Sequence, residues 1–210
     1  MTELIYYEDQ YKKEIEAKIL KIEGNRVVLD KTIFIPQTNT EPGDYGKINN
    51  MKIAGSKKEA QDIWHIFPKP IPFQEENTVK LDLDWNKRFS AMRLHSALHL
   101  LAGPFDKNFA KRAVAGALKA NHAYLVFKEE IGDEIIEKAL EQANKDIQNN
   151  LEIKSYWDEN REGFRWTKVG DYAPIPDGGL HVKNTKEIGK ISLVCKELEQ
   201  GKQKITISID

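Results

Sequence analysis

Two short segments of the chain concentrate the residues that bind metal ions. His95 and His99 are four residues apart in Arg-Leu-His-Ser-Ala-Leu-His, and Asp177 and His181 have the same spacing in Asp-Gly-Gly-Leu-His. Side chains four apart on a helix lie one above the other on one face, so two histidines at this spacing can bind one ion. Three of the five histidines fall in these segments, and this concentration predicts a metal site.

The ligand types of this predicted site leave its role open. Imidazole and carboxylate groups bind zinc, and manganese or iron would also accept them because no thiolate is present. Four tight ligands would complete a structural site, whereas a loose or missing ligand would leave a position for water or substrate. Ser96 stands where the metalloprotease motif His-Glu-x-x-His has its glutamate, so no general base is supplied there.

The remaining histidines and the single cysteine are weaker candidates. We interpret His65, in Ile-Trp-His-Ile, and His122, in Asn-His-Ala, as structural residues. Cys195 falls in the alternating run Ile191, Leu193, Cys195, which predicts a small apolar side chain buried in a strand.

The composition predicts a globular cytoplasmic protein. The 210 residues are 40% hydrophobic and 31% charged, which is ordinary for a chain with a packed core. The sequence has no signal-peptide pattern, no apolar run of the ~18–20 residues that span a bilayer, and one cysteine. The net charge of −1 predicts no strong overall attraction to a polyanion. Two basic stretches nevertheless favour local nucleic-acid contact: six lysines between 182 and 204, and the group Lys107, Lys111, Arg112 and Lys119.

The elements that must position these residues divide the chain near residue 85. Short runs of alternating apolar residues predict a small N-terminal β-barrel-like domain over residues 1–85. Its predicted parts are a hairpin over 15–35 that turns at Gly24 and Asn25, a short strand at 33–35, a loop over 38–46 and a strand at 78–83.

Helices and strands are both predicted over residues 86–210. Asp84 is expected to cap a helix that carries His95 and His99 and stops at Gly103 and Pro104. The other predicted elements are a helix from 133 to 149 and strands at 123–127, 151–156, 191–196 and 204–209. This order predicts an α+β fold, with helices laid on an antiparallel sheet.

The motifs around the predicted site resemble one protein family. The segment Arg-Leu-His-Ser-Ala-Leu-His-Leu-Leu resembles the His-x-x-x-His segment of the alanyl-tRNA synthetase editing domain and of its free-standing relatives, the AlaX proteins. The segment from Asp177 to Gly189 resembles the family's Cys-x-Gly-Thr-His-Val and Thr-x-Glu-Ile-Gly motifs. Residues 29–36 and 42–48 resemble its N-terminal element. The resemblance covers nearly the whole chain, and 210 residues leave no room for a synthetase catalytic domain, so it indicates the medium-length AlaX type.

This resemblance implies a function and a set of functional residues. The implied reaction is hydrolysis of the ester that joins a wrong amino acid, serine or glycine, to alanine-specific tRNA. The implied zinc ligands are His95, His99, Asp177 and His181, and the three histidines are the implied catalytic residues. The zinc ion would position the substrate amino group or activate water. Further substrate contacts are expected from Ser96, Thr185, Lys183 and Lys186.

Two departures from the family pattern keep alternatives open. Asp177 stands where the family has a cysteine, and residues 37–41 replace a glycine-rich stretch. One alternative is a non-catalytic tRNA-binding module with a structural metal. Another is a deacylase for a different aminoacyl-tRNA, such as threonyl-tRNA. The sequence gives no indication of the oligomeric state.

Overall fold

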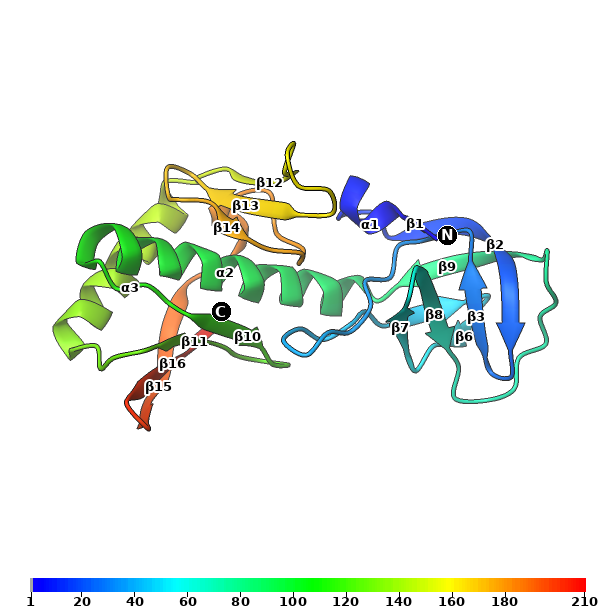
Figure 1. Cartoon of the computed structure of the whole chain (residues 1–210), viewed down its shortest axis with the longest axis horizontal. Coiled ribbons are helices and arrows are strands. Elements are labelled where there is room, and N and C mark those ends of the chain that lie inside the picture. Colours follow the sequence, from blue (N-terminus) through cyan, green and yellow to red (C-terminus); the bar gives the residue numbers. More distant parts are fainter. Residues whose placement is uncertain (1) are drawn as a thin grey trace. The chain divides into compact units, whose positions relative to one another are not determined.

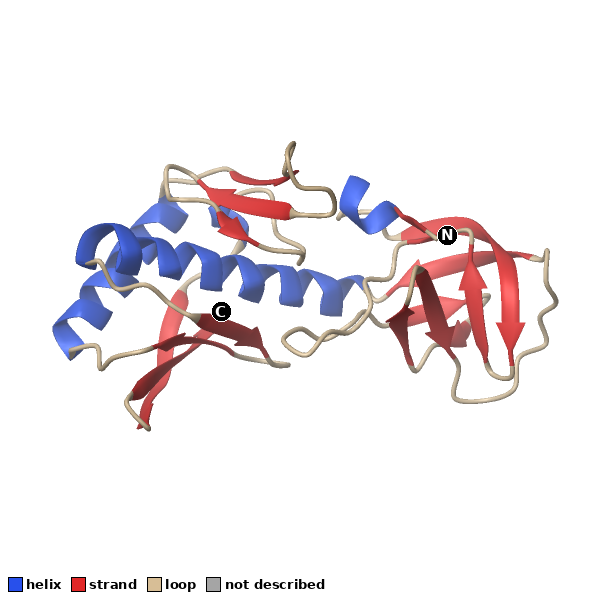
Figure 2. Ribbon diagram, viewed as in Figure 1, coloured by secondary structure: helices blue, strands red, loops and turns tan. Residues whose placement is uncertain are grey.

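The computed structural model describes residues 2–210, and the chain divides into two compact units. Unit 1 ends at Ser90 and unit 2 begins at Ala91. Helices and antiparallel strands together give the α+β class that the sequence predicts (Figures 1 and 2). Within residues 2–210, no helix has both the length and the apolar character that crossing a membrane requires.

Unit 1 is built on a curled sheet of seven antiparallel strands. The strand order in this sheet is β6-β5-β9-β2-β3-β8-β7, and β1 pairs separately with β4 in parallel. The elements are β1 (Glu3–Leu4), α1 (Ile5–Glu8), β2 (Glu14–Glu23), β3 (Arg26–Leu29), β4 (Lys31–Thr32), β5 (Gly46–Ile48), β6 (Met51–Lys52), β7 (Gly55–Glu59), β8 (Asp62–Ile66) and β9 (Thr78–Leu83). The sheet order has β6 and β7 at its two ends, so closure into a barrel stays a prediction.

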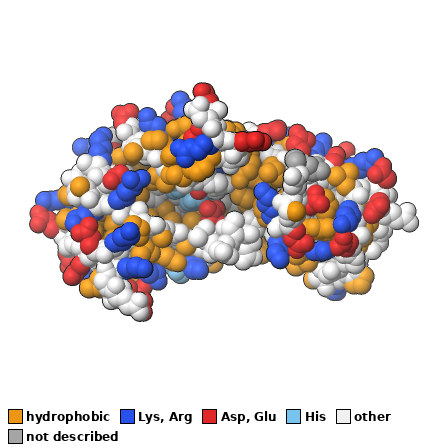
Figure 3. Space-filling view, in the orientation of Figure 1, with side chains coloured by type: hydrophobic (Ala, Val, Ile, Leu, Met, Phe, Trp, Pro, Cys, Tyr) orange, Lys and Arg blue, Asp and Glu red, His pale blue; other side chains and the backbone are white. Residues whose placement is uncertain are grey.

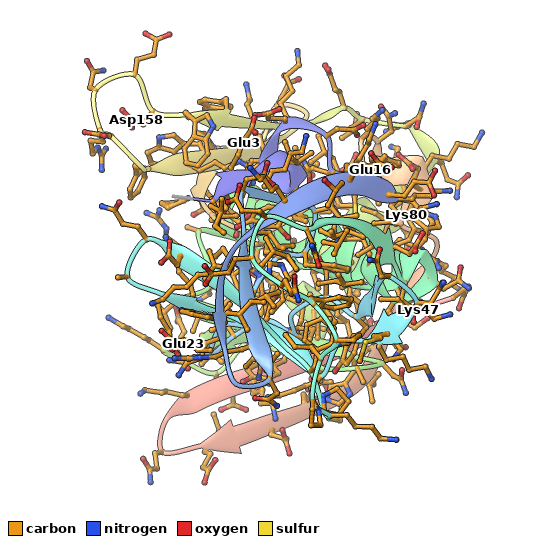
Figure 4. All side chains as sticks on the ribbon, turned by 90° about the vertical axis from the view of Figure 1, so that its right-hand side faces the viewer. Glu3, Glu16, Glu23, Lys47, Lys80 and Asp158 are labelled. Carbon is orange, nitrogen blue, oxygen red and sulfur yellow. The ribbon has the colours of Figure 1, made fainter. Side chains whose placement is uncertain are left out.

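The β2–β3 hairpin forms as its sequence predicts. Figure 4 labels Glu23 at the end of β2, and Gly24 follows with a φ of +59°, a conformation that glycine adopts without steric cost. Ala17 and Ile19 on β2 point into the same core as Val27 and Leu29 on β3. The alternation of buried and exposed residues around Ala17 and Ile19 on β2 fixes which face of that strand covers the core.

The predicted strand at 33–35 is wrong, because side chains bind its backbone groups. β4 ends at Thr32, and Ile33 and Phe34 are fully buried beyond it. The Ile33 carbonyl accepts a hydrogen bond from Arg88, and the Ile35 N–H donates to Asp44 at 2.6 Å. Asp44 and Arg88 also form a buried ion pair in unit 1.

Unit 2 places one long helix between two sheets. Figure 1 shows α2 (Trp85–Phe109), which begins in unit 1, running between the sheet β10-β11-β16-β15 and the sheet β12-β13-β14. The other elements are β10 (Ala115–Leu118), β11 (Ala123–Phe127), α3 (Asp133–Gln148), β12 (Ile153–Trp157), β13 (Arg165–Val169), β14 (Ile175–Pro176), the 3₁₀ helix η1 (Thr185–Glu187), β15 (Ile191–Glu199) and β16 (Lys202–Ile209).

α2 begins as predicted but does not stop where we expected. The Lys87 N–H donates to the Asp84 carboxylate at 3.3 Å, which caps the first turn. Gly103 and Pro104 lie inside the helix. Gly103 is a packing residue, because a Cβ there would lie 2.5 Å from the Tyr172 ring. The helix continues because Phe105 packs on Phe127 of β11, with ring centroids 4.9 Å apart.

The prediction of a buried Cys195 is also wrong. Cys195 is exposed, and β15 lies at the end of its four-stranded sheet. The register of β15 shifts between Leu193 and Cys195, which interrupts the alternation on which the prediction depended.

Candidate metal centre

The four residues singled out as metal ligands meet in unit 2. His95, His99, Asp177 and His181 each offer one ligand atom, and these atoms lie within 4.8 Å of one another. α2 supplies the first two side chains, and the segment between β14 and η1 supplies the others. Figure 3 shows histidine atoms beside acidic atoms in a hollow of the surface, surrounded by hydrophobic side chains.

The Asp177 carboxylate lies among the imidazole rings. Its Oδ2 lies 2.7 Å from Nε2 of His181, and its Oδ1 lies 3.4 Å from Nε2 of His95. The ring of His99 completes the group, with its centroid 4.7 Å from that of His181. The Nε2 atoms of His95 and His181 therefore face one carboxylate.

Strand β13 holds the segment that contains Asp177. The Asp177 N–H donates to the Arg165 carbonyl at 2.9 Å, and the Arg165 guanidinium donates to the Gly179 carbonyl at 2.6 Å. Within the segment, the Gly179 N–H donates to the Asp177 carboxylate at 3.1 Å. A carboxylate that accepts the N–H two residues ahead forms a tight local turn. That turn brings His181 back toward α2.

Ser96 fastens this segment to α2. Its Oγ lies 3.1 Å from Nδ1 of His181 and accepts a hydrogen bond from the Val182 N–H, also at 3.1 Å. The Ser96 side chain is fully buried. The structure places the Ser96 hydroxyl against His181 and Val182, and the substrate contact expected from the sequence stays a prediction.

The other predicted substrate residues lie at and around η1. The Thr185 hydroxyl is buried, where it accepts from the Leu151 N–H and donates to the Asp146 carbonyl, both at 2.8 Å. Lys183 and Lys186 have exposed side chains. Thr185 therefore anchors the turn from within, and the two lysines present charge at the surface.

Burial favours the neutral forms of His99 and His181 beside an ionised Asp177 carboxylate. Burial lowers the pKa of His181 to about 4 and holds the pKa of His99 well below its ordinary value. Burial alone would raise the pKa of the Asp177 carboxyl, but the three surrounding imidazoles outweigh it and hold that pKa below its ordinary value. Neutral histidine and ionised aspartate are the forms that bind a metal cation.

A metal ion fits this donor set. Within residues 2–210, Nδ1 of His99 is buried and has no hydrogen-bond partner. Buried polar atoms in proteins are normally satisfied, so a buried imidazole nitrogen of a cluster residue that has no hydrogen-bond partner is available as a metal donor. Nitrogen and carboxylate donors without sulfur suit zinc and other borderline divalent metals.

The remaining histidines, His65 and His122, are not members of the cluster of four. His65 is buried in unit 1, where its Nε2 lies 2.8 Å from the Thr32 hydroxyl. His122 is exposed in the turn between β10 and β11. Sequence reasoning missed Thr167, whose hydroxyl donates to Asp177 at 3.4 Å. The buried alternation of Arg165, Thr167 and Val169 is the signal that marks this face of β13.

The fold and the site together define the class of protein. It is an α+β protein in which a long helix and a glycine-containing turn bring three histidines and an aspartate together. The chain is 31% identical over 217 residues to alanyl-tRNA editing protein AlaX-M of Pyrococcus horikoshii, covering all of this chain and 99% of that protein. It is also 31% identical to AlaX-M of Saccharolobus solfataricus, over 100% of this chain and 99% of that protein. The chain belongs to the medium-length AlaX family of alanyl-tRNA editing proteins.

Longer proteins contain a related region. Alanine–tRNA ligase of Methanococcus aeolicus is 32% identical over 233 residues, which cover 97% of this chain and 25% of the ligase. A scan against models of known protein families matches none of them.

Proposed function

We propose that this protein is an aminoacyl-tRNA deacylase that removes serine, and glycine as a second substrate, from alanine-specific tRNA. The observation that carries the proposal is the convergence of His95, His99, Asp177 and His181 in a chain that belongs to the AlaX family. The deacylase site then lies in unit 2, and the partner is a tRNA of the cytoplasm.

The four converging side chains are proposed as the ligands of one zinc ion. When bound, zinc would hold the substrate amino group or polarise a water molecule. The neutral state of His99 and His181 keeps their nitrogen lone pairs available without a proton having to be displaced at neutral pH. Asp177 supplies the negative charge of the set.

Ser96 is proposed as a positioning residue that acts on the substrate through His181. A serine hydroxyl can donate one hydrogen bond and accept two, so it can serve either neutral tautomer of His181. When it accepts from Nδ1–H, the Nε2 lone pair faces the cluster. The Val182 N–H fixes the hydroxyl oxygen in place at the same time.

Lys183 and Lys186 are proposed to contact phosphates at the acceptor end of the tRNA. Both side chains are exposed, and both follow His181 within five residues. Lysine contacts to phosphates contribute affinity that falls as salt concentration rises.

The test is hydrolysis of seryl-tRNA, glycyl-tRNA and alanyl-tRNA, all on the alanine tRNA, by the purified protein and a His95→Ala, His99→Ala variant. His122→Ala is the matched control, because His122 is an exposed histidine outside the cluster. We expect loss of serine and glycine but not alanine, abolished only in the double variant.

Four converging donors would also suit a closed structural site. Binding of the alanine tRNA without hydrolysis would therefore support a non-catalytic module and contradict the proposal. Threonyl-tRNA is assayed as a fourth substrate, and its hydrolysis without hydrolysis of seryl- or glycyl-tRNA would contradict the assigned substrate and identify a different deacylase.

A further inference from the structure

One face of the sheet β12-β13-β14 is turned toward the metal centre. Alternate residues of a strand share a face, so Thr167 and Arg165 on β13 lie on the same side of the sheet. Thr167 donates to the Asp177 carboxylate, and Arg165 donates to the Gly179 carbonyl. This side is called the site face below.

Trp157 occupies the exposed end of the site face. In the antiparallel register Ser155 lies opposite Thr167, and Trp157 lies opposite Arg165. The Ser155 and Thr167 hydroxyls are 2.8 Å apart. Trp157 is therefore two residues, or about 7 Å, along the strand from Ser155, whose partner Thr167 contacts Asp177. Its side chain is 49% exposed, whereas Thr167 and Arg165 are buried.

The opposite face of the same sheet has a different character. Tyr156 lies opposite Trp166, and the Trp166 indole donates to Asp158 at 2.7 Å. Arg161 covers the rings of Phe164 and Trp166, with its guanidinium carbon 4.7 Å and 5.7 Å from their centroids. Figure 4 labels Asp158 in the loop after β12 that makes these contacts. The Trp166 and Phe164 rings on this side thus pack against the loop after β12.

We propose that Trp157 is the stacking surface for the unpaired terminal base of the aminoacyl-tRNA. This inference rests on the proposed function, because the ester to be hydrolysed is on the ribose of that terminal nucleotide. The base lies within one nucleoside of the ester, which matches the separation of Trp157 from the residues that contact Asp177. An indole ring offers a flat surface to any base.

Arg165 strengthens the assignment electrostatically. Its guanidinium carbon lies 6.0 Å from the centroid of the Trp157 ring, and its side chain is 6% exposed. A fixed positive charge beside the stacking ring favours the phosphate that joins the terminal nucleotide to the next one.

The test compares Trp157→Ala, Trp157→Phe and Tyr156→Ala in the full-length protein. Tyr156→Ala is the matched control, because Tyr156 is the neighbouring strand residue, is 44% exposed and lies on the opposite face. The first readout is binding of uncharged RNA hairpins that end with or without the terminal adenosine, measured by fluorescence anisotropy. The second is kcat and KM for the seryl form of the complete hairpin.

We expect Trp157→Ala to weaken binding of the complete hairpin by about 5- to 150-fold, the range for loss of one stacked base. The same variant should not change binding of the hairpin that lacks the adenosine. Trp157→Phe should retain most of the affinity, and Tyr156→Ala should change it less than twofold. Trp157→Ala should also raise KM for the seryl form of the complete hairpin.

Unchanged binding in Trp157→Ala, or an equal loss with both hairpins, would overturn the inference. The binding comparison uses uncharged RNA, so its result is independent of whether the protein hydrolyses seryl-tRNA. If the wild-type protein does not hydrolyse seryl-tRNA, the proposed function is contradicted. If Trp157→Ala still weakens binding only of the hairpin that ends with the adenosine, the stacking role of Trp157 holds independently.

Discussion

Replacement of Ser96 by alanine should weaken zinc binding without removing a ligand. The substitution leaves two buried groups, Nδ1 of His181 and the Val182 N–H, without the oxygen that both contact at 3.1 Å. Each unsatisfied buried group costs about 1–3 kcal/mol, so the loss of a partner for both groups should lower the free energy of unfolding by about 2–6 kcal/mol. Loss of a partner that orients a ligating histidine typically lowers metal affinity about 10- to 100-fold.

The assay is competition for zinc between the protein and a chromophoric chelator, together with urea unfolding in EDTA. Ser90→Ala is the matched control, because Ser90 is an exposed serine of the same helix and the change has the same intrinsic effect on helix stability. Ser96→Thr keeps the hydroxyl and should recover most of the zinc affinity. A zinc dissociation constant for Ser96→Ala within about threefold of wild type would refute the positioning role, whatever happened to stability.

Three further predictions follow from the structure. Asp177→Asn should lower zinc affinity by more than about 100-fold, because it removes the carboxylate charge of the ligand set; an affinity equal to wild type by the same competition assay would show that Asp177 is not a ligand. Asp44→Asn should lower the free energy of unfolding by about 3–5 kcal/mol in urea, because the buried Arg88 guanidinium loses its counter-ion; a loss below 1 kcal/mol would contradict this. Burial lowers the pKa of His65 from 6.5 to about 4, so the unfolded chain takes up that proton first, and stability present above pH 6.5 is lost as pH falls toward 4. That loss of stability is about 3 kcal/mol. In His65→Gln, the free energy of unfolding, measured with urea in EDTA at pH values from 7 to 4, should fall by about 3 kcal/mol less than in wild type. An unchanged dependence on pH would exclude His65 as the source of the loss.

The convergence of the metal cluster could be predicted because the sequence places its members in short, well-spaced pairs. His95 and His99 share a helix face by spacing alone, and the glycines between Asp177 and His181 permit the turn between those residues. The family motifs then indicated that the two pairs belong to one site. The spacing of the residues and the family resemblance together were sufficient to predict that these four side chains meet.

The parts that failed depend on contacts between residues distant in sequence. The backbone at 33–35 bonds to Asp44 and Arg88, 9 and 55 residues away, so local alternation could not reveal it. The type of residue at Gly103 was also ambiguous. Glycine often ends a helix, but here it lies within α2 and its missing side chain lets the Tyr172 ring pack against the helix. The contact between the Ser96 hydroxyl and His181 spans 85 residues, so the local pattern could not reveal it either.

The most direct test of the central claim is deacylation of seryl-tRNA by protein stripped of metal and then titrated with zinc. We expect the stripped protein to be inactive and activity to return in proportion to zinc, reaching its maximum at one ion per chain. Full activity in protein that contains no metal would contradict the proposal that the cluster of His95, His99, Asp177 and His181 works as a zinc site.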